Sequence, residues 1–159
     1  MEQPSFIKMQ SPVGELTIFA TDTAVIGISF ELPESMRRML RYVRHYYGEP
    51  VMAENPLLKS AKEEICEYFD KERRGFTVKL EYKGTAFQHR VWDTLLKVPY
   101  GELLTYGELA RRAGVPAASR AVGAACGANP IALIIPCHRA VGTDRSEEHT
   151  SELQSHHDL

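Results

Sequence analysis

The residue best suited to chemistry in this sequence is Cys137, which lies between Pro136 and the pair His138-Arg139. A cysteine attacks as its thiolate. A neighbouring imidazole can take the thiol proton, directly or through water, and a guanidinium favours negative charge. Pro136 fixes its own φ and biases Ile135 toward extended geometry, so the sulfur is expected at the end of a strand and not inside a helix. The alternative is a half-buried structural cysteine, and the tetrapeptide alone leaves both interpretations open.

The number and spacing of the cysteines indicate the redox compartment and the kinds of site to expect. The sequence has three cysteines, Cys66, Cys126 and Cys137, and no C-x-x-C pair. This pattern favours a reducing, cytoplasmic compartment and argues against a disulfide framework or a zinc site. The sequence offers no motif for a metal, nucleotide or organic cofactor, so we expect none. Cys66 falls in a helical pattern and is expected to be buried and inert.

The hydrophobic patterns predict an α+β fold with two domains. Residues 1–82 are predicted to form an N-terminal support domain without a catalytic cluster. Its predicted elements are a β-meander with strands at 6–9, 16–20 and 25–30, helices at 35–47 and 56–70, and a returning strand at 76–80.

Residues 83–144 are predicted to form a second, mostly helical domain. Thr85 and Thr105 are suitable N-caps for helices that run to about residues 97 and 113. A turn at 114–116 separates the second helix from a third, which begins at 117 or 118 and ends near 127. Two helices joined by a short turn that contains glycine are typical of a helix-turn-helix.

The motifs of this second domain resemble one family. They occur in the order Gly84-Thr85-Ala86-Phe87-Gln88, Val91-Trp92, Val98-Pro99-Tyr100-Gly101, Thr105-Tyr106-Gly107-Glu108-Leu109-Ala110, Arg120-Ala121-Val122-Gly123, Asn129-Pro130 and Pro136-Cys137-His138-Arg139. Together they resemble the O6-alkylguanine-DNA alkyltransferases, the methylated-DNA–protein-cysteine methyltransferases. The resemblance is weaker but present at Ser11–Thr17 and Glu67–Phe69.

The resemblance implies DNA repair by a single, irreversible alkyl transfer. The alkyl group of O6-alkylguanine, and also of O4-alkylthymine, would pass to Cys137. His138 would remove the thiol proton through water, and Arg139 would support the local structure. Tyr106 would press on the target phosphate and protonate the leaving base, and Asn129 would brace the turn that holds the cysteine. Taken alone, a tyrosine at a helix start such as Tyr106 is more often a packing residue, and Asn129 is compatible with an ordinary Asn-Pro turn.

The third predicted helix has the composition that flipping a base out of a duplex requires. Its residues are small apart from Arg120, and a lone planar cation can fill the gap that an extruded nucleotide leaves. The resemblance places this helix in the minor groove of double-stranded DNA, bound by a monomer. The predicted DNA-binding residues are Tyr106, Ala118, Ser119, Arg120, Ala121 and Gly123. An alanine-rich helix packed in the core is the alternative, and both can hold for different faces.

Net charge agrees with only modest DNA affinity. The chain carries 19 basic and 21 acidic side chains, for a formal charge of −2, whereas residues 84–144 carry six and four. A surplus of this size predicts a few phosphate contacts and a shallow salt dependence.

The family pattern stops at Asp144. Residues 145–159 resemble the translation of a sequencing-adapter oligonucleotide, and we predict a non-native tail that neither packs nor forms regular structure. The C-terminal end of the second domain would then be missing. In the family this end supplies a loop over the alkyl-base pocket and a glutamate that orients the histidine, so activity of this chain would be impaired.

Two other functions compete with alkyl transfer. The chain could be a non-transferring helix-turn-helix module that binds alkylated DNA, although such relatives carry another residue at the position of Cys137. A cysteine hydrolase needs a second, distant histidine and an oxyanion site. Outside the tail only His45 and His89 remain for that role, and no motif surrounds them.

Overall fold

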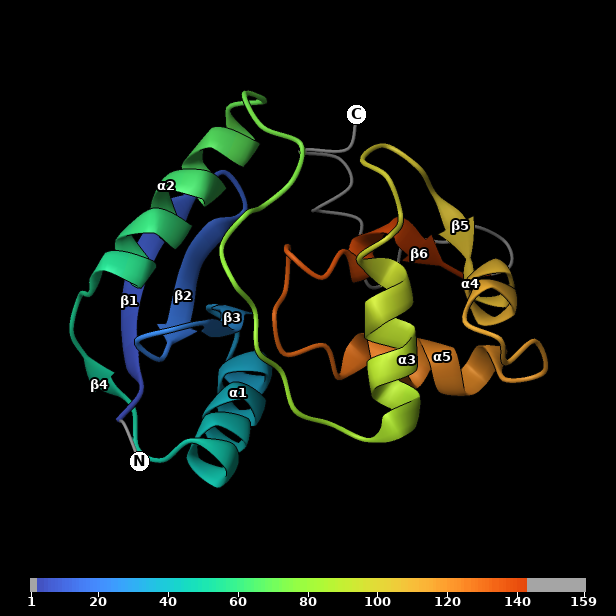
Figure 1. Ribbon diagram of the computed structural model, residues 1–159, viewed down its shortest axis with the longest axis horizontal. Helices are drawn as coiled ribbons and strands as arrows, with labels where there is room; N and C mark the ends of the chain where they lie inside the picture. Colours follow the sequence, from blue (N-terminus) through green and yellow to red (C-terminus); the bar gives the residue numbers. More distant parts are fainter. Residues whose placement is uncertain (1–2, 143–159) are drawn as a thin grey trace. The chain divides into compact units, whose positions relative to one another are not determined.

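The computed structural model describes residues 3–142, which form two compact units (Figure 1). The first unit contains residues 3–83 and 130–132, and the second contains residues 84–129 and 133–142. Residues 130–132, assigned from the sequence to the second domain, cluster with the first unit because the Ile28 N–H donates to the Pro130 carbonyl at 3.0 Å. The tail predicted at 145–159 lies outside the described residues.

The first unit is built on a four-stranded sheet. Its strands are β1 (Ser5–Ser11), β2 (Gly14–Ala20), β3 (Val25–Phe30) and β4 (Val51–Met52), in the order β3-β2-β1-β4. The first three pair antiparallel and confirm the predicted meander, while β4 pairs parallel with β1. β4 was not predicted, because two residues are too few to show a hydrophobic period.

Two helices pack on this sheet. They are α1 (Pro33–Tyr46) and α2 (Pro56–Phe69), and each begins at a proline, whose fixed φ suits the first helical position. One apolar cluster joins α1 to the sheet and consists of Phe19, Ile26, Met39, Val43 and Tyr47. Gly27 permits this packing, since a Cβ there would lie 2.7 Å from the sulfur of Met39.

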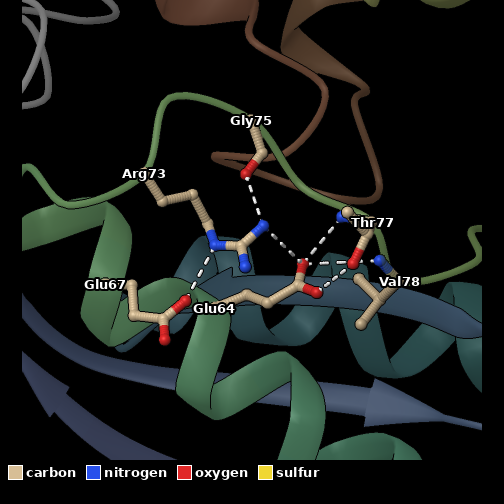
Figure 2. A network of polar contacts seen from close by, with 6 residues as sticks. All are labelled: Glu64, Glu67, Arg73, Gly75, Thr77 and Val78. Atoms are coloured by element: carbon tan, nitrogen blue, oxygen red, sulfur yellow. Dashed lines mark hydrogen bonds and ion pairs between the residues drawn. The ribbon is translucent and has the colours of Figure 1, made fainter.

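The strand predicted at 76–80 is wrong, and the carboxylate of Glu64 explains why (Figure 2). It accepts the backbone N–H of Thr77 at 2.8 Å and of Val78 at 3.4 Å, and also the Thr77 hydroxyl. These donors therefore bond to a side chain instead of to a neighbouring strand. Only an isolated bridge between Leu80 and Val25 remains of the predicted pairing.

Arg73, in the loop after α2, completes this polar network. Its guanidinium donates to the Glu67 carboxylate at 2.9 Å and to the Gly75 carbonyl at 3.2 Å, and it lies 3.9 Å from Glu64 (Figure 2). The loop after α2 is therefore held by two carboxylates and one cation. Glu64 is buried, so its hydrogen bonds are protected from competition with water.

We predict that Glu64→Ala destabilises the first unit. The substitution leaves the N–H groups of Thr77 and Val78 without their acceptor, at a cost of about 2–3 kcal/mol. Urea unfolding should report this loss, whereas Glu63→Ala, at an exposed position of the same helix, should change the free energy of unfolding little. Equal effects of the two substitutions would contradict a structural role for the network.

The second unit is mostly helical. Its elements are α3 (Ala86–Leu95), β5 (Leu104–Thr105), α4 (Tyr106–Arg112), α5 (Ser119–Gly127), a 3₁₀ turn η1 (Cys137–Arg139) and β6 (Ala140–Val141). α3 and α4 begin where predicted: the hydroxyls of Thr85 and Thr105 cap them, and each cap is part of a reciprocal capping box. Gly114, with φ of 80°, forms the turn after α4. α4, this turn and α5 give the predicted helix-turn-helix order.

Trp92 is a core residue. It is buried in α3, and its indole N–H donates to the carbonyl of Ala125 in α5 at 2.9 Å. The same hydrogen bond ties the first helix of the unit to the helix predicted to read DNA.

Further observations concern membrane spans, metal sites and the cysteines. No helix between residues 3 and 142 is long and apolar enough to cross a membrane. Over the same residues, no three potential ligands among His, Cys, Asp and Glu gather as a metal site would require. All three cysteines are free. Cys66 is exposed, so its expected burial is wrong: its position on α2 faces solvent, although the helix itself was predicted.

Candidate active site

Cys137 opens the turn η1 and is half-buried. Its sulfur accepts a hydrogen bond from the side-chain amide of Asn129, with 3.2 Å between Nδ2 and Sγ. The same nitrogen donates to the carbonyl of Ile135 at 2.8 Å, and the backbone N–H of Asn129 donates to the carbonyl of Cys126 at 3.2 Å. Asn129 is therefore fixed to α5 on one side and to the cysteine turn on the other.

The ionisation of Cys137 differs from the expectation of a ready thiolate. Burial raises the pKa of the Cys137 thiol, and this effect outweighs the hydrogen bonds from Asn129 and from the backbone, which lower it. Burial also raises the pKa of Cys126, and the nearby Cys137 raises it further. At neutral pH both sulfurs are thiols, so attack by Cys137 requires removal of its proton at the time of reaction.

Arg139 contacts the loop after α3. Its buried guanidinium donates to the carbonyl of Val98 at 2.9 Å and lies 5.6 Å from the ring centroid of Tyr100. Arg139 therefore fixes the loop after α3 to the turn that carries Cys137. His138, the next residue after the cysteine, is fully buried within η1.

The start of α4 is tied to the cysteine turn through a two-stranded sheet. β5 pairs parallel with β6, with Leu104 opposite Ala140 and Thr105 opposite Val141. Tyr106 follows β5 directly and is the first residue of α4. The sheet thus connects the tyrosine and the cysteine through backbone hydrogen bonds.

α5 has a buried face and an exposed face. Val122, Ala125 and Cys126 are buried, and Arg120 and Ala121 are exposed. Ala118, Ser119 and Gly123 are partly exposed. The small residues thus serve both alternatives raised by the sequence, packing on one face and an open backbone on the other.

Arg120 lies at the beginning of this exposed face. In the part of the chain that the structure describes, its guanidinium forms no ion pair with a carboxylate. Its charge is therefore not neutralised by a neighbour within that part of the chain.

Sequence reasoning missed two supporting contacts. The carbonyl of Cys126 anchors Asn129, and Val98 with Tyr100 anchors Arg139. The Val98-Pro99-Tyr100 motif was a signal for the second, since its residues were recognised but not connected to the cysteine turn. No pattern points to the first, because it is made by a backbone carbonyl.

Two family profiles match the chain. Residues 6–82 match the ribonuclease-like domain of 6-O-methylguanine DNA methyltransferase, and residues 86–158 match the DNA-binding domain of the same family. The chain is similar to the methylated-DNA–protein-cysteine methyltransferase of Mycobacterium bovis, with 38% identity over 84% of this chain and 76% of that protein. It is 40% identical to the Haemophilus influenzae enzyme of the same name, over 86% of this chain and 72% of that protein.

Solved structures agree with these matches. The crystal structure of Mycobacterium tuberculosis OGT in complex with DNA has a TM-score of 0.76 and 36% identity, and covers 91% of this chain and 82% of that one. The M. tuberculosis O6-methylguanine methyltransferase has a TM-score of 0.77 and 31% identity, and covers 97% and 90% of the two chains.

Proposed function

The chain belongs to the 6-O-methylguanine DNA methyltransferase family, and from that premise we propose that Cys137 is the residue that accepts the alkyl group. The family activity is repair of O6-alkylguanine in DNA by transfer of the alkyl group to a cysteine of the protein. The observation that carries the assignment to Cys137 is the 3.2 Å hydrogen bond from the Asn129 amide to its sulfur. An amide N–H donated to sulfur stabilises a thiolate more than a thiol.

The proposed reaction is an in-line displacement at the alkyl carbon. His138 removes the thiol proton through a water molecule, and the sulfur of Cys137 forms a bond to carbon as the bond from carbon to O6 breaks. The electron pair goes to the guanine, which takes a proton from the hydroxyl of Tyr106. The thioether product is stable, and we propose no group that regenerates the thiol. Each molecule therefore reacts once. Its substrate is O6-alkylguanine, which leaves guanine, or O4-alkylthymine, which leaves thymine.

DNA binding is proposed to use the exposed face of α5. Ala118 gives the helix no side-chain cap, so its first N–H groups are available to phosphate oxygens. Ser119, Ala121 and Gly123 keep the backbone open to a minor groove, and Arg120 replaces the flipped nucleotide in the stack. One chain acts as a monomer on double-stranded DNA.

A stoichiometry measurement tests this proposal. Incubation with excess O6-benzylguanine that carries a fluorophore on the benzyl group should label each active chain once, and labelling should then stop. Continued turnover would contradict a stable thioether. Binding of methylated duplex without any labelling would favour the non-transferring DNA-binding module.

Asn129→Ala should slow the transfer and shift its pH dependence. The hydrogen bond from Asn129 lowers the pKa of Cys137, so its loss raises that pKa further and leaves less thiolate at pH 7. Hydrogen bonds to charged groups contribute about 1.5–3 kcal/mol, which predicts a transfer rate at pH 7 that is about 10- to 100-fold lower. The rate should be measured with free O6-benzylguanine from pH 6 to 10, and the rise should move to higher pH.

Asn55→Ala is the matched control, because Asn55 caps α2 in the first unit and has no contact with the cysteine. It should lower stability without moving the pH profile. An unshifted profile for Asn129→Ala would show that its amide does not act on the sulfur.

We propose that residues 145–159 are a non-native, adapter-derived tail, although the match to the DNA-binding domain of the family extends to residue 158. A chain ended after Asp144 should then have the same midpoint of thermal unfolding as the full chain. A clear fall in that midpoint would show that the tail packs on the body and would contradict the proposal.

The free cysteines support the proposed cytoplasmic location, since a reducing compartment keeps thiols unpaired.

A further inference from the structure

Gly123 of α5 lies directly against the ring of Tyr106. A Cβ built on Gly123 would be 3.3 Å from Cε2, 3.4 Å from Cδ2 and 3.7 Å from Cζ of that ring. The first two distances are shorter than the 3.5–4.0 Å at which carbon atoms attract most strongly. A Cβ at position 123 would therefore require the ring to move by a few tenths of an ångström.

The helical geometry of α5 does not require glycine at this position. Gly123 lies inside the helix without a positive φ, where alanine would be about 1 kcal/mol more favourable. Gly127 of the same helix shows the contrast, since a Cβ there would meet nothing within 4 Å. Close approach to the ring of Tyr106 is thus a specific reason for glycine at 123.

The other end of Tyr106 is fixed by its backbone. Thr105 caps α4 and pairs with Val141 in β6, so the Cα of Tyr106 has little freedom to move. With the backbone held, the contact with Gly123 limits where the ring can lie and where its hydroxyl can point. We propose that Gly123 is a positioning residue for Tyr106, which sets the location of the hydroxyl that protonates the leaving base.

This inference rests on the role proposed above for Tyr106 and predicts a pattern that differs from direct DNA contact. If Gly123 only allowed α5 to approach the groove, Gly123→Ala would slow transfer from duplex DNA and leave the free base unaffected. If it positions Tyr106, transfer from both substrates slows, because the free base also needs its proton. A misplaced catalytic group commonly costs up to about 100-fold in rate.

A double-mutant cycle tests the proposal. Gly123→Ala, Tyr106→Ala and the double variant are compared for transfer from methylated duplex and from O6-benzylguanine. We expect Gly123→Ala to slow both reactions at least about 10-fold in the wild-type background and less than about 2-fold in the Tyr106→Ala background. Gly127→Ala should leave both rates within about 2-fold of the parent. Additive effects, or slowing confined to duplex, would overturn the proposal.

A direct readout separates this inference from the role of Tyr106. In NMR spectra the ring protons of Tyr106 should shift in Gly123→Ala and stay in place in Gly127→Ala, and unmoved signals would overturn the packing argument. If the ring moves but Tyr106→Ala transfers at the parent rate, the proposed proton donation fails and the positioning has no catalytic use. If Gly123→Ala does not fold, recovery of folding in the double variant still supports a clash with the ring, and its absence opposes one.

Discussion

Cys137→Ala is expected to abolish alkyl transfer and to leave binding to methylated duplex DNA largely intact. The substitution removes the sulfur that receives the hydrogen bond from Asn129, and no other described thiol is similarly placed. Cys126 is buried with a raised pKa, and Cys66 is exposed on α2 in the other unit. Transfer is measured with a radiolabelled methyl group on the duplex, and binding by fluorescence anisotropy.

Cys126→Ala and Cys66→Ala are the matched controls for this result. Each removes one thiol. Cys66→Ala should transfer at the parent rate. Cys126→Ala is expected to retain the acceptor, although a methyl-sized void is left in the core. Residual methylation of the Cys137→Ala protein would identify another acceptor and refute the assignment.

Arg120→Ala is expected to slow transfer from duplex DNA by about 10- to 100-fold while transfer to the protein from free O6-benzylguanine stays near the parent rate. Extruding a stacked base costs a few kcal/mol, and a planar cation that fills the gap offsets part of that cost. Arg120 is exposed at the start of α5, where such an insertion is sterically open. The free base needs no extrusion, so its rate should not depend on this side chain.

The control removes a cation of the same unit outside the helix-turn-helix. Lys97→Ala, just beyond α3, also lowers the charge by one and should slow the duplex reaction far less. Equal slowing of both substrates by Arg120→Ala would indicate damage to the fold. Equal slowing of duplex transfer by the two variants would indicate that charge alone matters and that Arg120 has no special role in flipping.

Most of the fold could be predicted because its signals are local. The period of 2 in the meander and the N-caps at Thr85 and Thr105 each act within a few residues, and the structure has these elements where they were expected. The failures came from long-range contacts. Glu64 takes the N–H groups of the predicted strand at 76–80, and a carboxylate that is distant in sequence leaves no trace in the pattern of that segment.

The residues that form the site could be predicted from the sequence better than their contacts and ionisation could. The ordered motifs singled out Asn129 and Cys137, and the structure places the amide of one on the sulfur of the other. Arg139 supports the local structure, as expected, because its guanidinium bonds to Val98 in another loop. The pKa of Cys137 was misjudged, since burial depends on the packing of the whole unit and not on the four residues around it.

Cys137, and no other residue, is proposed to receive the alkyl group from DNA. The most direct test is mass spectrometry of peptides from the full chain after reaction with duplex DNA that contains O6-methylguanine. We expect a gain of about 14 mass units, one methyl replacing one hydrogen, on the peptide that contains Cys137 and on no other. Methylation of the peptide with Cys66 or Cys126 in place of the peptide with Cys137 would contradict this assignment.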